Sequence, residues 1–444
     1  RLKTKAPISY TMAKRFNLYG KRPMYCMQLF FSCQDHMRKF AGMCERSSVY
    51  IPGIGNFGPG DLKVHEQGVD TIIKFATMQD IDLADWISCK SESGIDKETR
   101  DSESDSDPDS ESDHESNADN DSDADSQHFS TADRSITVES KDVSRFSFES
   151  PVFTKPLYCS FDIECYSENH NAKDPEPLNP ANKIFQVSMI FGHLGEPKST
   201  RDSILLTLFD PIDTGRLFND KPAIIVRCKT EKDLLLKFTE IMNERDPDII
   251  LGYNILKFDW GYMISRAEML GIYSRFIVLS RIIGKRAHLG EVSWSSSAYG
   301  KQEFRFLMPY GRTNVDLMLE IERNYRLTSY SLNNVSKEFL GDSKDDINYK
   351  QLFLLYKLSD EILPLFDDAA SDDATASVTT ISIEDIKSRI GSILTRDNSK
   401  GEVKTLRKEL LAAKSLIQLH TLTRKAITIV GEYCIQDSQL PIDL

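Results

Sequence analysis

The sequence lacks several features that would assign it to well-known protein classes. It contains no run of about 18 apolar residues, so we expect no transmembrane helix and no membrane partner. The stretch 1–14 lacks the apolar segment of a signal peptide. The eight cysteines are scattered without a C-x-x-C pair or a histidine-rich companion, which argues against a zinc site or a disulfide framework. Reduced, mostly buried thiols in a nuclear or cytosolic compartment are the simpler interpretation.

The chain also lacks an initial methionine, since it begins with Arg1, and we therefore expect an internal fragment or a processed chain. Its 444 residues, 40% of them hydrophobic, are enough for two or three domains with their own cores.

The negative charge is concentrated in one tract. The net charge of the chain is −13, and residues 91–128 hold 15 acidic and two basic residues, which accounts for all of it. The tract is rich in serine and almost free of apolar residues, so it cannot bury enough surface to fold. We expect an acidic, disordered linker or insertion over 91–150. A solvated spacer is the simpler interpretation, and the alternatives are a target of acidic-directed kinases or a mimic of DNA phosphates.

Changes in composition and in hydrophobic periodicity divide the rest of the chain into regions. Residues 1–90 predict a small mixed α/β domain with strand-like runs at 25–31 and 72–76. Residues 151–444 predict an α/β fold, a mixed sheet with helices packed on it. An insertion at about 366–425 contains a polar loop followed by helical periodicity. The expected strands are 157–165, 184–191, 204–209 and 223–227, and the expected helices are 230–243, 384–394 and 402–439.

Acidic side chains in three short segments indicate a metal-dependent nuclease. Asp162 and Glu164 of F-D-I-E-C are two apart on a predicted strand, so both carboxylates lie on one face. Asp259 ends the turn-rich segment G-Y-N-I-L-K-F-D, and Tyr433 and Asp437 are four apart on a predicted helix and share a face. Carboxylates that gather in one place repel each other unless they are compensated, and divalent cations are the natural compensation.

Each segment also has an ordinary interpretation. D-x-E occurs by chance on the surfaces of acidic proteins, and Y-x-x-x-D fits any helix face. G-Y-N-x-x-x-F-D is more specific, because a Gly-Tyr-Asn turn that leads to an apolar residue and a carboxylate has no generic structural need. Basic residues follow one side of the last predicted helix, where a solvated face is the simpler interpretation and a DNA-facing stripe the alternative: Lys404, Arg407, Lys408, Lys414, Arg424 and Lys425.

In their order, the three motifs resemble those of the 3′-to-5′ exonuclease of family B DNA polymerases. The flanking segments 246–254, 327–341 and 432–441 look like the delta-type replicative polymerases of eukaryotes and large DNA viruses. The similarity is good over 151–366 and 426–444 and weaker around Trp86. The resemblance implies a ribonuclease-H-like exonuclease domain, with a mixed five-stranded sheet and flanking helices.

The resemblance also implies roles for single residues. The activity would be proofreading, the removal of mismatched 3′ nucleotides by hydrolysis with two divalent ions, Mg²⁺ or Mn²⁺. The carboxylates that would hold these ions are Asp162, Glu164, Asp259 and Asp437. Tyr433 would orient the attacking water. Asn254 and Phe258 would contact the frayed 3′ end, Phe258 through a base and Asn254 through polar contacts.

The palm and fingers motifs of the polymerase are not found in these 444 residues. The string Y-G-R-T-N-V-D at 310–316 lacks the adjacent Asp residues of the palm, and Asp316 is expected to be a structural carboxylate. We therefore expect this chain to degrade DNA ends and not to synthesise DNA. A hairpin is predicted at 291–306, as the element that separates primer from template or as an ordinary sheet hairpin.

The expected partners are a single-stranded 3′ end and primer–template DNA, the palm, fingers and thumb of the parent chain, and a sliding clamp with accessory subunits. The expected location is the nucleus of a eukaryotic or virus-infected cell, or a cytoplasmic viral factory. Two alternatives remain: a catalytically silent DNA-binding module, and a replisome scaffold that acts through the acidic tract.

Overall fold

The computed structural model divides the chain into two compact units, one formed by residues 1–98 and 136–152, the other by 99–135 and 153–444. The expected acidic tract 91–128 and residues 368–380 of the expected polar loop lie outside the described residues. The described residues are 9–16, 23–32, 34–51, 53–65, 68–82, 86–89, 130–131, 138–147, 154–169, 171, 174–296, 300–341, 347–367, 382–394 and 401–444.

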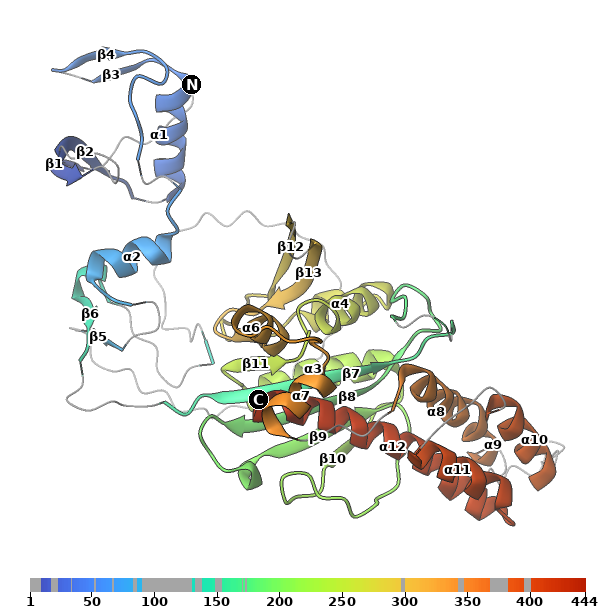
Figure 1. Cartoon of the computed structure of the whole chain (residues 1–444). Coiled ribbons are helices and arrows are strands. Elements are labelled where there is room, and N and C mark those ends of the chain that lie inside the picture. The colour runs from blue at the N-terminus through green and yellow to red at the C-terminus, as the bar shows by residue number, and fades with distance from the viewer. Residues whose placement is uncertain are drawn as a thin grey trace, which may run out of the picture. The chain divides into compact units, whose positions relative to one another are not determined.

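The N-terminal unit mixes short antiparallel strand pairs with helices (Figure 1). The strands pair as β1 with β2, β3 with β4 and β5 with β6. In chain order its elements are β1 Ser9–Phe16, β2 Pro23–Phe30, α1 Gln34–Arg46, β3 Val49–Ile51, β4 Gly55–Phe57, α2 Thr71–Gln79, β5 Ile87–Cys89, the short 3-10 helix η1 Ser140–Asp142 and β6 Val143–Arg145. The last two elements come from the segment in which the sequence indicated a linker.

The strand predicted at 72–76 is wrong, because these residues belong to helix α2. The Asp70 side chain accepts hydrogen bonds from the backbone N–H groups of Ile72 and Ile73, at 2.8 and 3.2 Å, and so caps the first turn. At the other end Asp80 adopts a left-handed conformation with φ of 53°. The β-branched isoleucines favoured a strand, but the cap decided for a helix.

The larger unit is built on a mixed sheet of six strands, one more than expected (Figure 1). The strand order is β10-β9-β8-β7-β11-β14, and β8 runs antiparallel to both of its neighbours while the other pairs are parallel. The predicted mixed α/β architecture of this region is confirmed. The strands are β7 Leu157–Cys165, β8 Ile184–His193, β9 Asp202–Thr207, β10 Ile224–Arg227, β11 Ile249–Gly252 and β14 Thr313–Asp316.

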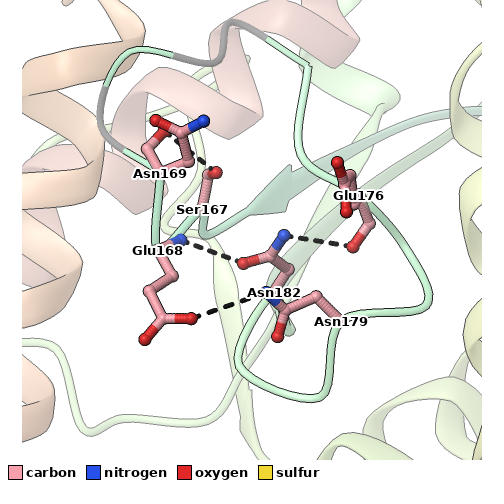
Figure 2. Close-up of a pocket in the computed structure, with 6 residues that line it drawn as sticks. All are labelled: Ser167, Glu168, Asn169, Glu176, Asn179 and Asn182. Carbon is pink, nitrogen blue, oxygen red and sulfur yellow. Dashed lines mark hydrogen bonds between the residues drawn. The ribbon is translucent and has the colours of Figure 1, made fainter.

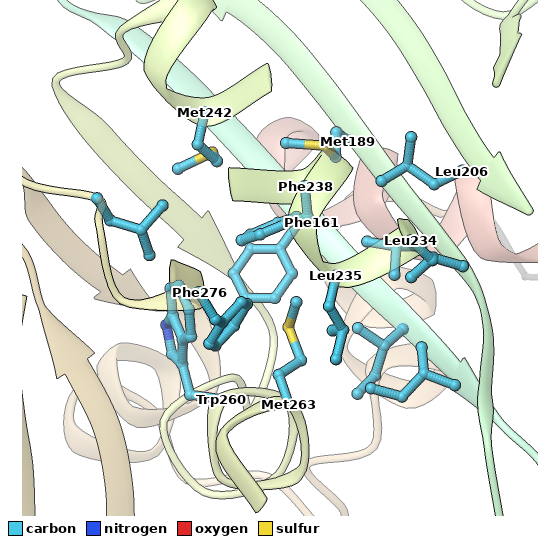
Figure 3. Packing of buried hydrophobic residues seen from close by; sticks show 14 of the residues in the cluster. Phe161, Met189, Leu206, Leu234, Leu235, Phe238, Met242, Trp260, Met263 and Phe276 are labelled. Carbon is cyan, nitrogen blue, oxygen red and sulfur yellow. The ribbon is translucent and has the colours of Figure 1, made fainter. Parts of the chain in front are cut away.

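One face of the sheet carries the main apolar core, which is shared with three helices: α3 Glu231–Arg245, α4 Asp259–Met269 and α5 Tyr273–Phe276. Phe161 of β7 lies at the centre of this cluster (Figure 3). Its ring meets those of Phe238 and Trp260 edge-on, at centroid distances of 5.4 and 5.2 Å. Thr230 and Asp233 form a reciprocal capping box that starts α3 next to the strands.

The other face carries α12 Leu416–Asp443, which packs on β7, β8 and β9. The N-terminal part of α12 shares a second apolar cluster with other helices of this unit. The helix predicted at 402–439 is interrupted at 413–415, where Ser415 caps the start of α12. The further helices are η2 Lys198–Thr200, α6 Leu317–Asn324, α7 Leu332–Leu340, α8 Tyr349–Ile362, α9 Pro364–Asp367, α10 Ile383–Leu394 and α11 Gly401–Ala412.

The predicted hairpin is confirmed as β12 His288–Ser296 and β13 Gly300–Met308, which pair in a two-stranded sheet of their own. Arg305 of β13 donates to Ser265 Oγ and Glu268 Oε1 of α4, at 2.8 and 2.7 Å, and so ties the hairpin to that helix.

Within the described part of the chain, no helix has both the length and the apolar character that a membrane crossing requires. The cysteines that the structure describes are free thiols.

Candidate active site

The alternation of β7 places two carboxylates on the face that α12 covers. Asp162 is half-buried and Glu164 is 7% exposed. Phe161, the residue before Asp162, points into the main core on the opposite face of the sheet. In the register with β8, Asp162 lies opposite Ser188 and Glu164 lies opposite Gln186. The prediction that the two carboxylates share a face is therefore confirmed.

The turn after β11 is shaped by its own sequence. A Cβ atom on Gly252 would lie 2.9 Å from the Phe161 carbonyl oxygen, closer than side chains tolerate. Asn254 adopts φ of 65°, a conformation that asparagine accepts more readily than most residues. The Tyr253 hydroxyl donates to the Tyr330 carbonyl at 2.6 Å. Each of the three residues of the Gly-Tyr-Asn turn therefore has a structural role in this protein.

Asp316, at the end of β14, holds this turn in place and is the structural carboxylate that the sequence indicated. Its Oδ1 accepts from the backbone N–H groups of Asn254 and Met318, at 2.8 and 3.1 Å. Its Oδ2 accepts from the N–H of Leu256 at 3.0 Å. The same carboxylate thus caps α6 and fixes the chain that leads to Asp259.

Asp259 is the first residue of α4 and is only 3% exposed. Burial raises the pKa of its carboxyl group to about 7, and the negative charges of Asp316 and Asp437 act in the same direction. Backbone N–H groups, including that of Ile163, oppose the shift. Asp259 therefore lies within the electrostatic reach of both β7 and α12.

Tyr433 and Asp437 of α12 face the carboxylates of β7. Burial raises the pKa of the Tyr433 hydroxyl, and the charges of Asp437, Glu164 and Asp162 raise it further. Between them in sequence, the Cys434 thiol donates to the Asp162 carbonyl at 3.6 Å. One ligand atom each from Asp162, Glu164 and Cys434 lie within 4.8 Å of one another.

The structure thus brings together the five residues that the sequence singled out for catalysis: Asp162, Glu164, Asp259, Tyr433 and Asp437. They come from β7, α4 and α12, which are far apart in sequence. The carboxylate oxygens are hard ligands, and their mutual repulsion in a largely buried place calls for positive charge. The donor set fits Mg²⁺ or Mn²⁺.

Asn254 and Phe258 lie on the segment between β11 and α4. Both are half-buried, and the Phe258 ring packs against Tyr262 at a centroid distance of 5.6 Å. These contacts give both residues a structural role, to which any contact with a substrate would be added.

Sequence reasoning missed four residues behind the cluster: Gln186, Ser188, Gly431 and Ser438. They lie where β8 and α12 meet, and all of the side-chain contacts between them are buried. A signal was available, because Gln186 and Ser188 are polar residues two apart within the apolar part of the strand.

A polar cavity of about 230 Å³ lies in the loop between β7 and β8 (Figure 2). Asn182 organises it, since its Oδ1 accepts from the Glu168 N–H at 2.9 Å and its Nδ2 donates to the Glu176 carbonyl at 3.1 Å. None of the predicted site residues is among those that line it: Ser167, Glu168, Asn169, Glu176, Asn179 and Asn182.

The basic side of the last helices is partly engaged within the protein. Arg424 donates to the carbonyls of Asp210 and Pro211, at 2.9 and 3.1 Å, and Lys425 pairs with Glu409 at 3.2 Å. These contacts give Arg424 and Lys425 structural roles within the protein.

Comparison with known proteins is consistent with this geometry. The family described as "DNA polymerase family B, exonuclease domain" matches residues 62–335. DNA polymerase 037L of Invertebrate iridescent virus 6 is 27% identical over 96% of this chain and 35% of its own length. DNA polymerase 120R of Invertebrate iridescent virus 3 is 36% identical over 46% of this chain and 17% of its own length. The DNA polymerase delta catalytic subunit of Oryza sativa subsp. japonica is 37% identical over 43% of this chain and 16% of its own length. The chain therefore spans about a third or less of the length of these relatives.

Proposed function

Because the chain belongs to DNA polymerase family B and contains its exonuclease domain, we propose that it removes nucleotides from the 3′ end of DNA by hydrolysis, as a proofreading nuclease. The observation that carries the proposal is the meeting of carboxylates from β7, α4 and α12 in one largely buried cluster.

Four carboxylates would hold two divalent ions: Asp162, Glu164, Asp259 and Asp437. When bound, Mg²⁺ or Mn²⁺ would supply acidification of water and neutralisation of charge on the scissile phosphate. The protein itself supplies the fixed arrangement, because Asp162 and Glu164 stand on a central strand and Asp437 stands on a helix packed against it. The turn held by Asp316 sets the place of Asp259.

Tyr433 would orient the water that attacks the phosphate. Its raised pKa means that the phenol keeps its proton at neutral pH, so it can exchange hydrogen bonds with water but cannot serve as a base. Asn254 and Phe258, which lie five residues and one residue before Asp259, would contact the terminal nucleotide of the DNA strand, Phe258 through its ring.

The proposal extends to the fold and to the parent protein. The strand order, with β8 as the single antiparallel strand of the six, supports a ribonuclease-H-like exonuclease domain within 151–444. An N-terminal domain at 1–90 and a linker at 91–150 would precede it, and η1 and β6 at the end of that linker would belong to the N-terminal unit. The relatives are named DNA polymerases, which supports a parent that synthesises DNA. By the resemblance, that parent would contain palm, fingers and thumb domains and would act beside a sliding clamp and accessory subunits. Its place would be the nucleus or a cytoplasmic viral factory.

The test is a gel assay of a 5′-labelled single-stranded oligonucleotide with the 444-residue chain, in Mg²⁺ and in EDTA. We expect a ladder of 3′-shortened products only with metal. The double variant Asp162→Ala, Glu164→Ala should slow this loss by at least about 100-fold, since bound metal contributes several kcal/mol to such reactions.

A matched control is the double variant Glu240→Ala, Glu244→Ala, which removes two exposed carboxylates from α3 on the other side of the sheet. It should cleave like the parent chain. Binding of the oligonucleotide by folded protein without any shortening, in Mg²⁺ and in Mn²⁺, would contradict the proposal and favour a silent DNA-binding module.

A further inference from the structure

Four positions of helix α12 that lie against β8 and β9 form a stripe along the helix. Its residues Ile427, Gly431, Cys434 and Ser438 contact β8 or β9, and they follow one another at steps of four, three and four residues. Residues at these steps share one face of a helix. The stripe therefore defines which side of α12 is turned to the sheet.

Two polar side chains of β8 bind the backbone of α12 along this stripe. Ser188 Oγ donates to the Cys434 carbonyl at 2.7 Å and also contacts Ser438 Oγ. Gln186 Nε2 donates to the Ile427 carbonyl at 3.1 Å. Gln186, Ser188 and Ser438 are fully buried. Buried hydrogen bonds of this kind are directional, so they favour one rotation and one axial position of the helix.

Gly431 allows α12 to approach the sheet closely enough for these bonds. A Cβ atom at this position would lie 2.5 Å from Leu205 Cδ2 and 3.3 Å from Gln186 Nε2. Any side chain would therefore have to displace Leu205 or lift the helix. Apolar contacts of Ile190 and Leu205 with Ile435 also hold α12 on the sheet, but such contacts are not directional.

The same two strand residues are the cross-strand neighbours of the carboxylates. Ser188 lies opposite Asp162, and Gln186 lies opposite Glu164. On the helix, Tyr433 and Asp437 each stand one residue before a member of the stripe. One helical residue corresponds to a rotation of about 100° and a rise of about 1.5 Å. A small rotation or axial shift of α12 on the sheet would thus move Tyr433 and Asp437 relative to β7.

We propose that Ser188, together with Gln186, Gly431 and Ser438, forms a β8–α12 latch that positions Tyr433 and Asp437 against Asp162 and Glu164. Ser188 is a positioning residue in this scheme, since it acts through the Cys434 carbonyl and not on the substrate. The inference rests on the proposed exonuclease function. The inference adds that Gln186 and Ser188 of β8 influence the affinity for metal and the turnover rate.

The test compares Ser188→Ala with Thr239→Val in the full 444-residue chain. Thr239 is a matched control, because its buried hydroxyl donates to the carbonyl of Phe276 at 2.9 Å and so also joins two elements, but on the far face of the sheet. Two readouts are needed: the Mn²⁺ affinity without DNA, from the electron paramagnetic resonance signal of free Mn²⁺, and kcat and KM for a single-stranded oligonucleotide.

We expect Ser188→Ala to weaken Mn²⁺ binding and to lower kcat, each by about tenfold, as is common for groups behind metal ligands. KM for the oligonucleotide should stay within about twofold, because the groups that bind DNA are unchanged. Thr239→Val should leave Mn²⁺ affinity and kcat unchanged, even if both variants unfold at a lower temperature. Ser188→Thr, which keeps the hydroxyl, should recover most of the lost Mn²⁺ affinity.

Unchanged Mn²⁺ affinity and kcat in Ser188→Ala would overturn the latch. If Ser188→Ala does not fold, Ser438→Ala, which removes the other hydroxyl of the pair, is compared with Thr239→Val instead. Lower Mn²⁺ affinity and kcat in Ser438→Ala would then support the latch, and unchanged values would overturn it. If the parent chain binds Mn²⁺ but cleaves no DNA, the proposed function fails, while the Mn²⁺ affinities of parent and variant still decide whether the latch exists.

Discussion

The two faces of strand β7 differ in what their side chains do. On one face Phe161 and Ile163 pack with α3 and α4 in the main apolar core. On the other face Asp162 and Glu164 meet α12, whose contacts with the sheet include buried hydrogen bonds as well as apolar packing.

This difference separates stability from chemistry within a single strand. The apolar face gains free energy in proportion to the area that it buries, and no particular rotation of α3 is needed for that gain. The carboxylate face gathers like charges, which cost free energy unless they are compensated. We therefore expect substitutions on the apolar face to lower mainly the free energy of unfolding, and substitutions on the carboxylate face to lower mainly the rate of catalysis.

The largest expected effect is that of Phe161→Ala. It should lower the free energy of unfolding of the larger unit by about 3–5 kcal/mol, because it leaves a cavity between Phe238 and Trp260. Urea unfolding followed by circular dichroism measures the loss. The neighbouring variant Asp162→Asn should change the metal-free unfolding free energy by less than about 1 kcal/mol. Equal losses in the two variants would show that the faces do not differ in this way.

A second effect is a dependence of stability on pH in the absence of metal. The pKa of Asp259 is raised from 3.8 to about 7 by burial, so between these values the unfolded chain is ionised there while the folded protein keeps its proton. Stability from this group is present below about pH 4 and is lost as the pH rises towards about 7, by on the order of a few kcal/mol.

Thermal unfolding in EDTA from pH 5 to pH 8 measures this slope. Asp259→Asn should flatten it, and Mg²⁺ should restore stability to the parent chain at pH 8 but much less to the variant. A parent chain whose metal-free stability rises with pH over this range would mean that Asp259 is ionised without help from a cation.

The smallest expected effect is that of Tyr433→Phe. Loss of the hydroxyl should lower kcat by about tenfold, which corresponds to about 1.4 kcal/mol, with little change in KM. Tyr262→Phe is the matched control, because the Tyr262 hydroxyl donates to the Asn182 carbonyl at 2.8 Å in the main core. That variant should lose about 1 kcal/mol of stability and keep its kcat. A reversed pattern would remove Tyr433 from the mechanism.

Local patterns predicted much of this structure. The period of two in β7 and the period of four between Tyr433 and Asp437 depend only on backbone geometry, so they could be read from the sequence. The prediction of a strand at 72–76 was wrong because Asp70 caps the start of a helix there. This single cap outweighed the preference of two isoleucines for a strand. Strand β10 was predicted at 223–227, whereas β11 and β14 were not among the expected strands, because strands of four residues carry little periodic signal.

The sequence by itself indicated the candidate site residues and determined which side of each element they occupy, because this depends on neighbours in the chain. Only the tertiary structure decided that α12 lies on the Asp162 face of the sheet and that Gly431 and Ser188 set its position. It also decided that Asp316 holds the turn before Asp259. These contacts join residues far apart in sequence, and their geometry follows from the packing of whole elements, which no local pattern records.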